Sequence, residues 1–200
     1  MRKLILAAVL AAPLLASAAV GTTLSGNLTV DNSFTAYLST TDSTLGTQIG
    51  SGSAWESTYS VSSVLTPNVT EYLHIVANNV GGPGAFIGSF SLDNSNFAFA
   101  NGTQTLLTNT TDWKQSATGF GSNYTTPISS GSNGVSPWGA QSGISSNAQW
   151  LAYQDGWTTA YFSTTITAVA AVPEPETYAM LLAGLGLIGA AVKRRKAKQA

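Results

Sequence analysis

The chain has 200 residues, a formal net charge of -1 and a charged fraction of only 8%, against about a quarter in typical soluble domains. Between about Gly21 and Val172 it holds seven acids against one lysine, Lys114, a net charge of -6. Because binding to nucleic acid requires basic side chains that neutralise phosphates, we expect no nucleic-acid partner. Cysteine is absent, so the fold contains no disulfide.

The N-terminus has the three parts of a secretory signal peptide. Arg2 and Lys3 give a positive start, an apolar run of about a dozen residues begins at Leu4, and Ala16, Ser17 and Ala18 form a small-residue cleavage pattern. The run is too short to cross a bilayer comfortably. We therefore predict a signal peptide over residues 1–18, removed by signal peptidase.

Residues 19–170 form the predicted folded domain, which is rich in Ser, Thr, Asn and Gly. Such residues suit strands and turns, and apolar and polar positions alternate with period two. The expected strands include Glu71–Ala77 and Ala85–Leu92, which the turn at 81–84 would join as a β-hairpin. Others are expected in the segments Leu24–Val30, Phe34–Leu38, Tyr59–Val61, Thr103–Thr108, Trp150–Tyr153 and Ala160–Ala168, and around Trp113.

These short strands predict an all-β fold, a single β-sandwich in jelly-roll style. The Gly/Ser/Asn-rich stretch Ser116–Ser146 fits either a long loop or two irregular strands. The segment Val30–Trp113 also resembles a jelly-roll module of secreted bacterial proteins. The likeness rests on an alternating strand after Asp31-Asn32, the loop at Trp55, the strand containing His74 and the Thr-Asp-Trp at 111–113.

Residues for catalysis are few. The single histidine, His74, lies in an expected strand, and the chain lacks the several Cys or His ligands that zinc requires. A glycosidase needs only two carboxylates about 5–10 Å apart, for which Glu56 and Glu71 are the glutamates available in the domain. We expect no catalytic activity, with a secreted glycan-active enzyme as the least favoured alternative.

Carbohydrate binding is the more attractive alternative, because five tryptophans are many for so polar a chain. Aromatic rings beside amide and carboxylate groups suit the faces and hydroxyls of sugars. The candidate sugar site of a lectin-like module consists of Asp31, Asn32, Trp55 and Trp113.

No cofactor and no dedicated metal site are expected. Oxygen ligands for a structural Ca²⁺ are nevertheless available at Asp31-Asn32, Asp93-Asn94 and Asp112. Asx residues in turns also cap the backbone, and the sequence leaves both interpretations open.

The C-terminal segment 171–200 has three parts in a fixed order: Pro173, Glu174 and Pro175; an uncharged stretch at 178–192; and a basic cluster at 193–198. The uncharged stretch predicts one transmembrane helix, although as a helix it would span only about 23 Å of a core of about 30 Å. The basic residues of the cluster would keep it in the cytoplasm; they are Lys193, Arg194, Arg195, Lys196 and Lys198.

This tail resembles the PEP-CTERM sorting signal of Gram-negative bacteria, on Pro173-Glu174-Pro175, the Gly-rich apolar stretch and the pair Arg194-Arg195. The resemblance implies recognition by exosortase, a membrane-embedded cysteine transpeptidase, and cleavage near the motif. It further implies an inner-membrane intermediate and delivery of the domain to the cell surface or extracellular polysaccharide. We therefore expect a non-catalytic surface or matrix protein of an exopolysaccharide or biofilm.

Overall fold

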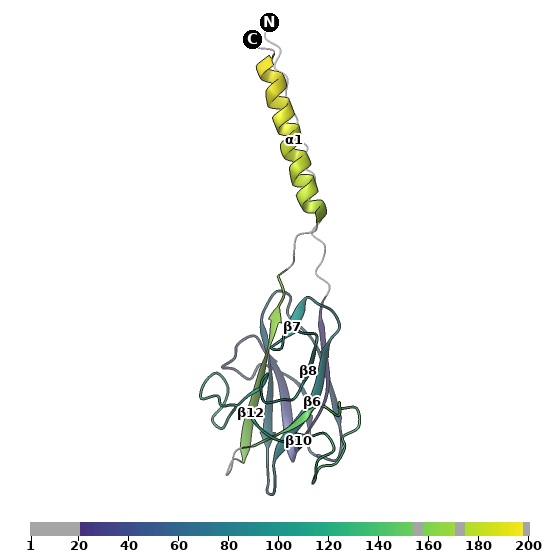
Figure 1. The fold of residues 1–200 in the computed structure, drawn as a ribbon. Coiled ribbons are helices and arrows are strands. Elements are labelled where there is room, and N and C mark those ends of the chain that lie inside the picture. Colours follow the sequence, from purple (N-terminus) through teal and green to yellow (C-terminus); the bar gives the residue numbers. More distant parts are fainter. Residues whose placement is uncertain (1–20, 154–157, 171–174, 198–200) are drawn as a thin grey trace.

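The computed structural model describes residues 21–153, 158–170 and 175–197, and its body consists of two packed antiparallel sheets of six strands each (Figure 1). The first sheet has the order β10-β11-β6-β1-β4, with β8 paired to β6. Its strands are β1 (Thr23–Asp31), β4 (Tyr59–Val64), β6 (Ala85–Leu92), β8 (Thr105–Leu107), β10 (Ile128–Ser132) and β11 (Gln149–Ala152).

The second sheet has the order β3-β2-β5-β12-β7, with β9 paired to β12. Its strands are β2 (Ser33–Ser39), β3 (Thr47–Gly52), β5 (Glu71–Asn78), β7 (Phe97–Phe99), β9 (Lys114–Ser116) and β12 (Thr159–Ala168). The predicted all-β, two-layer architecture is confirmed. The jelly-roll detail stays a prediction.

The main core lies between the sheets and is built by alternate residues of each strand. In β1 the inward positions include Leu24, Leu28 and Val30, all essentially buried, as expected where one face of a strand packs on a core. Aromatic rings fill the centre: Phe86 of the first sheet contacts Trp113 edge-on with ring centroids 5.0 Å apart, and Phe162 of the second at 5.2 Å.

Strands that follow each other in the chain often belong to different sheets. β5 lies in the second sheet and β6 in the first, so the turn at 81–84 crosses between layers. The predicted hairpin Glu71–Leu92 is therefore wrong, although both strands exist: β5 pairs with β2 and β12, and β6 with β1, β8 and β11. The alternation of apolar and polar residues indicates which face of a strand is buried. It would be the same whether the two strands paired with each other or lay in different sheets.

A second hydrophobic cluster covers part of the outer face of the first sheet. The segment 133–148, which follows β10, folds back over β6 and β11 and buries Trp138, Ile144 and Ala148 against Ile87 and Trp150. The stretch Ser116–Ser146 thus holds one strand, β10, within a longer irregular segment. The sequence fitted both a loop and irregular strands because polar side chains hold much of the segment in place. One of them is Asn133, whose amide donates to the carbonyls of residues 141 and 144.

One helix is present among the described residues, α1 (Pro175–Ala197), which follows the sandwich in the chain (Figure 1). Among the described residues, no helix combines the length and the apolar character that crossing a membrane requires. The transmembrane helix predicted at 178–192 is therefore not confirmed. The physical reason is that its uncharged part ends after fifteen residues, where the basic cluster begins at Lys193.

Candidate functional site

The C-terminal segment is seen in part. Pro173 and Glu174 lie outside the described residues, and α1 begins at Pro175, the first helical position that proline favours. The apolar side chains of α1 are exposed, including Met180 at 69% and Leu187 at 74%. Arg194 and Arg195 are exposed near its C-terminal end, where cations complement the helix dipole.

The predicted signal-cleavage residues Ala16, Ser17 and Ala18 lie outside the described residues, as does Trp157. The predicted signal peptide therefore stays a prediction.

The four residues of the proposed sugar site are not brought together. Trp113 is 1% exposed in the core between the sheets, where its Nε1 donates to the carbonyl of Leu107. Asn32 accepts a hydrogen bond from the backbone N–H of Val80 and so fixes a turn. Asp31 and the half-buried Trp55 lie at the same end of the first sheet. The set of four therefore forms no shared ligand surface.

Asp31 instead forms a buried pair that the sequence did not indicate. The indole Nε1 of Trp138 donates to Asp31 Oδ2 at 2.8 Å, from 107 residues away in the chain. Trp138 in turn stacks on Trp150 with ring centroids 4.6 Å apart. Burial raises the pKa of Asp31, partly offset by the Trp138 hydrogen bond. The pair ties segment 133–148 to the end of β1.

A polar cluster lies on the outer face of the second sheet around Asp42, in the turn after β2. Its carboxylate accepts hydrogen bonds from the hydroxyls of Tyr124 at 2.8 Å and Ser163 at 3.2 Å, and contacts Lys114 Nζ and His74 Nε2 at 3.4 Å each. Burial alone would raise the pKa of Asp42, but the Tyr124 hydrogen bond and the Lys114 charge outweigh it and lower that pKa.

His74 belongs to this cluster but is fully buried. Phe120 stacks on its ring with centroids 3.8 Å apart. Burial lowers the pKa of His74, which favours the neutral ring at pH 7. In the tautomer protonated on Nε2, that ring donates to the carboxylate of Asp42. Ser163, its cross-strand neighbour, donates to Asp42 and not to the imidazole. Through Tyr124 and Phe120, the cluster acts as a clamp that holds the segment 118–125 on the sheet. The Ser163 hydroxyl is not hydrogen-bonded to the imidazole that would activate it as a nucleophile.

The two candidate glutamates lie far apart. Glu71 begins β5, is 2% exposed and accepts from the backbone N–H of Thr66 at 2.7 Å. The other end of β5, Asn78, pairs with Ser33 beside the Asp31 end, where Glu56 is exposed. A strand of this length spans roughly 23 Å, well beyond the 5–10 Å of a carboxylate pair.

The candidate calcium ligands form hydrogen bonds within the fold. Asp93 accepts from the backbone N–H of Thr23 and from Asn94, and Asp112 accepts from Asn109. Within the described residues, no group of three or more His, Asp or Glu side chains could hold a metal ion.

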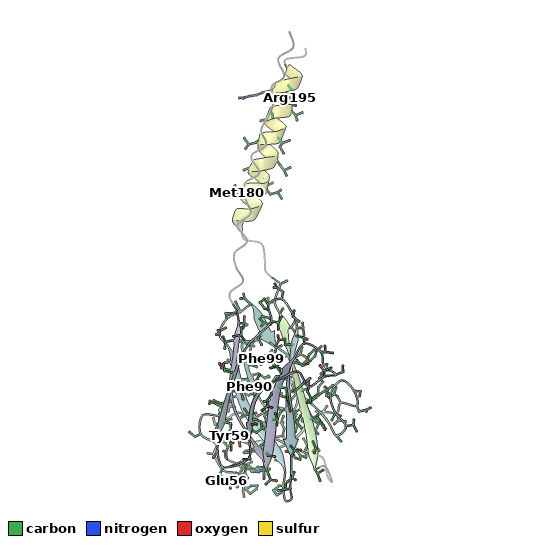
Figure 2. All side chains as sticks on the ribbon, turned by 180° about the vertical axis from the view of Figure 1, so that it is seen from behind. Glu56, Tyr59, Phe90, Phe99, Met180 and Arg195 are labelled. Atoms are coloured by element: carbon green, nitrogen blue, oxygen red, sulfur yellow. The ribbon has the colours of Figure 1, made fainter. Side chains whose placement is uncertain are left out.

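Sequence reasoning missed a shallow groove on the outer face of the first sheet. Two contiguous depressions of about 420 and 490 Å³ share Asn27 and Ser60 as lining residues. The second extends to Glu56, at the end of the sandwich farthest from α1 (Figure 2). The available signal was the alternation of serines along β4 and β6 and of Ser25 and Asn27 in β1, but only the strand register shows that these residues meet.

Comparison with known proteins identifies the C-terminal segment. Residues 171–196 match the family model described as the PEP-CTERM protein-sorting motif. The resemblance of the tail to that signal is therefore confirmed. No curated protein and no solved structure matches the chain.

Proposed function

We propose that this protein, which carries a PEP-CTERM sorting motif, is a surface or extracellular-matrix component with no catalytic activity of its own. The motif at residues 171–196 carries the proposal. It implies processing by exosortase and export, through a membrane intermediate, to the cell surface or the extracellular space. The finer role, in an exopolysaccharide or biofilm matrix, is the proposed part.

The character of the folded domain supports a structural role. It carries few charges, its surface is rich in hydroxyl and amide groups, and its most elaborate polar cluster, at Asp42, is built around a fully buried imidazole. Hydrogen-bonded polar groups suit a hydrated polysaccharide environment.

The experiment follows the mass and the location of the protein in a host with an exosortase and in a matched deletion strain. We expect loss of a C-terminal piece and surface or extracellular delivery only when the transpeptidase is present. Pro173→Ala combined with Pro175→Ala should prevent processing. Arg2→Lys, which keeps the positive charge at the other terminus, is the matched control and should be processed normally. An intact, cell-retained chain in both strains would overturn the sorting part.

A test of matrix function uses the same strains. Deleting this protein should lower the amount of protein and polysaccharide recovered together from the extracellular matrix. A matrix that is unchanged in mass and cohesion would overturn the structural role and leave sorting intact.

A second candidate function is binding of carbohydrate in the manner of a lectin. The groove at Asn27 and Ser60 favours it, in place of the four residues first considered.

A further inference from the structure

Polar side chains are in register across the groove side of the first sheet. Ser25 of β1 lies opposite Ser62 of β4 on one side and Ser91 of β6 on the other. Two residues further along, Asn27 lies opposite Ser60 and Ser89 in the same way. Because neighbouring strands lie about 4.8 Å apart and alternate residues about 6.7 Å apart, the result is a regular two-row array of hydroxyl and amide groups.

The two rows differ in what their polar groups do. Asn27 accepts from the hydroxyl of Ser60 at 2.8 Å and donates to the carbonyl of Gly143 at 3.0 Å, so this row is locked to segment 133–148. The side chains of Ser25, Ser62 and Ser91 are exposed and form no hydrogen bond with another described residue. The array thus combines a fixed row with a row of free hydroxyls.

The two depressions together form one elongated groove over this array. The first contains both rows, and the second continues along β4 past Thr58 to Glu56, walled by Gln141 and Ser142. From Ser62 to Tyr59 the floor follows β4, and it then continues through the turn that precedes this strand to Glu56. A long, shallow and open floor fits an extended chain better than a compact small molecule.

The charge of the groove narrows the class of ligand. Its lining contains no basic residue and a single acid, Glu56. Lys114 is on the opposite sheet, paired with Asp42. Anionic chains would meet a carboxylate without a compensating cation, whereas the hydroxyls of neutral sugars can donate to Glu56 and exchange hydrogen bonds with the serines.

We propose that this groove binds an extended strand of a neutral polysaccharide, with the free serine row and Glu56 as its polar contacts. This deepens the second candidate function and does not depend on sorting. The two proposals can fail separately, because sorting is tested by the processing and location of the protein in cells, whereas the groove is tested by the binding of polysaccharide to purified protein.

The test is affinity electrophoresis of the purified full chain in gels containing mixed-linkage β-glucan, dextran, galactomannan, alginate or chitosan. Ser62→Arg places a long side chain across the groove, and Ser142→Arg blocks it from the wall if the first variant folds poorly. Ser51→Arg is the matched control, an exposed serine on the edge strand of the opposite sheet. Urea midpoints identify any variant that is not folded.

We expect retardation by at least one of the three neutral glycans and none by alginate. Ser62→Arg and Ser142→Arg should weaken it at least tenfold, and Ser51→Arg should behave as wild type. Absence of retardation by all three neutral glycans, or equal retardation of the groove and control variants, overturns the proposal. Retardation by chitosan alone that Glu56→Gln abolishes would also overturn it, in favour of a cationic amino-sugar chain.

Discussion

Replacing Asp42 by alanine should destabilise the domain well beyond the effect of an ordinary surface substitution. The substitution removes an acceptor for the hydroxyls of Tyr124 and Ser163 and for the imidazole of His74. Hydrogen bonds to charged groups contribute about 1.5–3 kcal/mol each, but the contact with His74 is long, and the 41% exposed Lys114 side chain adds little because solvent screens it. We therefore expect a loss of about 2–4 kcal/mol in the free energy of unfolding.

Urea unfolding followed by far-UV circular dichroism measures this loss at pH 7. Asp42→Asn is the matched variant: it keeps a carbonyl acceptor of the same shape and should lose roughly half as much. Limited proteolysis should show new cleavage near Phe120 in Asp42→Ala, because the segment 118–125 is then held less firmly. A loss below about 0.5 kcal/mol, within the range of ordinary surface substitutions, would refute the assignment of Asp42 as a clamp.

Three further predictions concern side-chain contacts within the two sheets. Because burial lowers the pKa of His74, its protonation opposes folding, so stability should fall as the pH drops from about 7 to 5.5; His74→Phe, compared by urea midpoints at both values, should flatten this dependence. Trp138→Phe removes the donor to the buried Asp31 and should lower the free energy of unfolding by about 1.5–3 kcal/mol at pH 7, and by less at pH 4, where the raised pKa leaves more of Asp31 protonated. Gly26→Ala would place a Cβ against the ring of Phe90 and should lower the free energy of unfolding by about 1–3 kcal/mol, part of which Phe90→Leu should restore in the double variant. Equal thermal midpoints for Gly26→Ala and wild type would contradict this packing.

The sequence predicted strands well where one face of the strand is buried. Glu71–Ala77 alternates visibly and is β5 almost residue for residue. Strand pairing could not be predicted, because the same turn residues at 81–84 would suit either a hairpin within one sheet or a crossover between two sheets. Register depends on contacts between distant segments, which alternation within one segment does not record.

For the candidate site, too, the sequence indicated which residue types were present but not which of them meet in the fold. Trp113 was a candidate because an aromatic face near polar side chains suits a sugar, yet its ring packs against Phe86 and Phe90 in the core. Asp31 looked like a loop ligand, and its partner is 107 residues away. The serines at 25 and 62 carried no individual signal, since a groove arises only when β1 and β4 place them opposite each other.

The position of β12 has a mechanical consequence. This strand leads directly toward the sorting segment and lies inside the second sheet, with eight residues in register with β5 and further pairing to β7 and β9. A pulling force transmitted through the C-terminal segment therefore runs along the strand and loads these hydrogen bonds in shear, all at once, instead of opening them one after another. Under a force applied between that end and the opposite end of the sandwich, this arrangement resists extension.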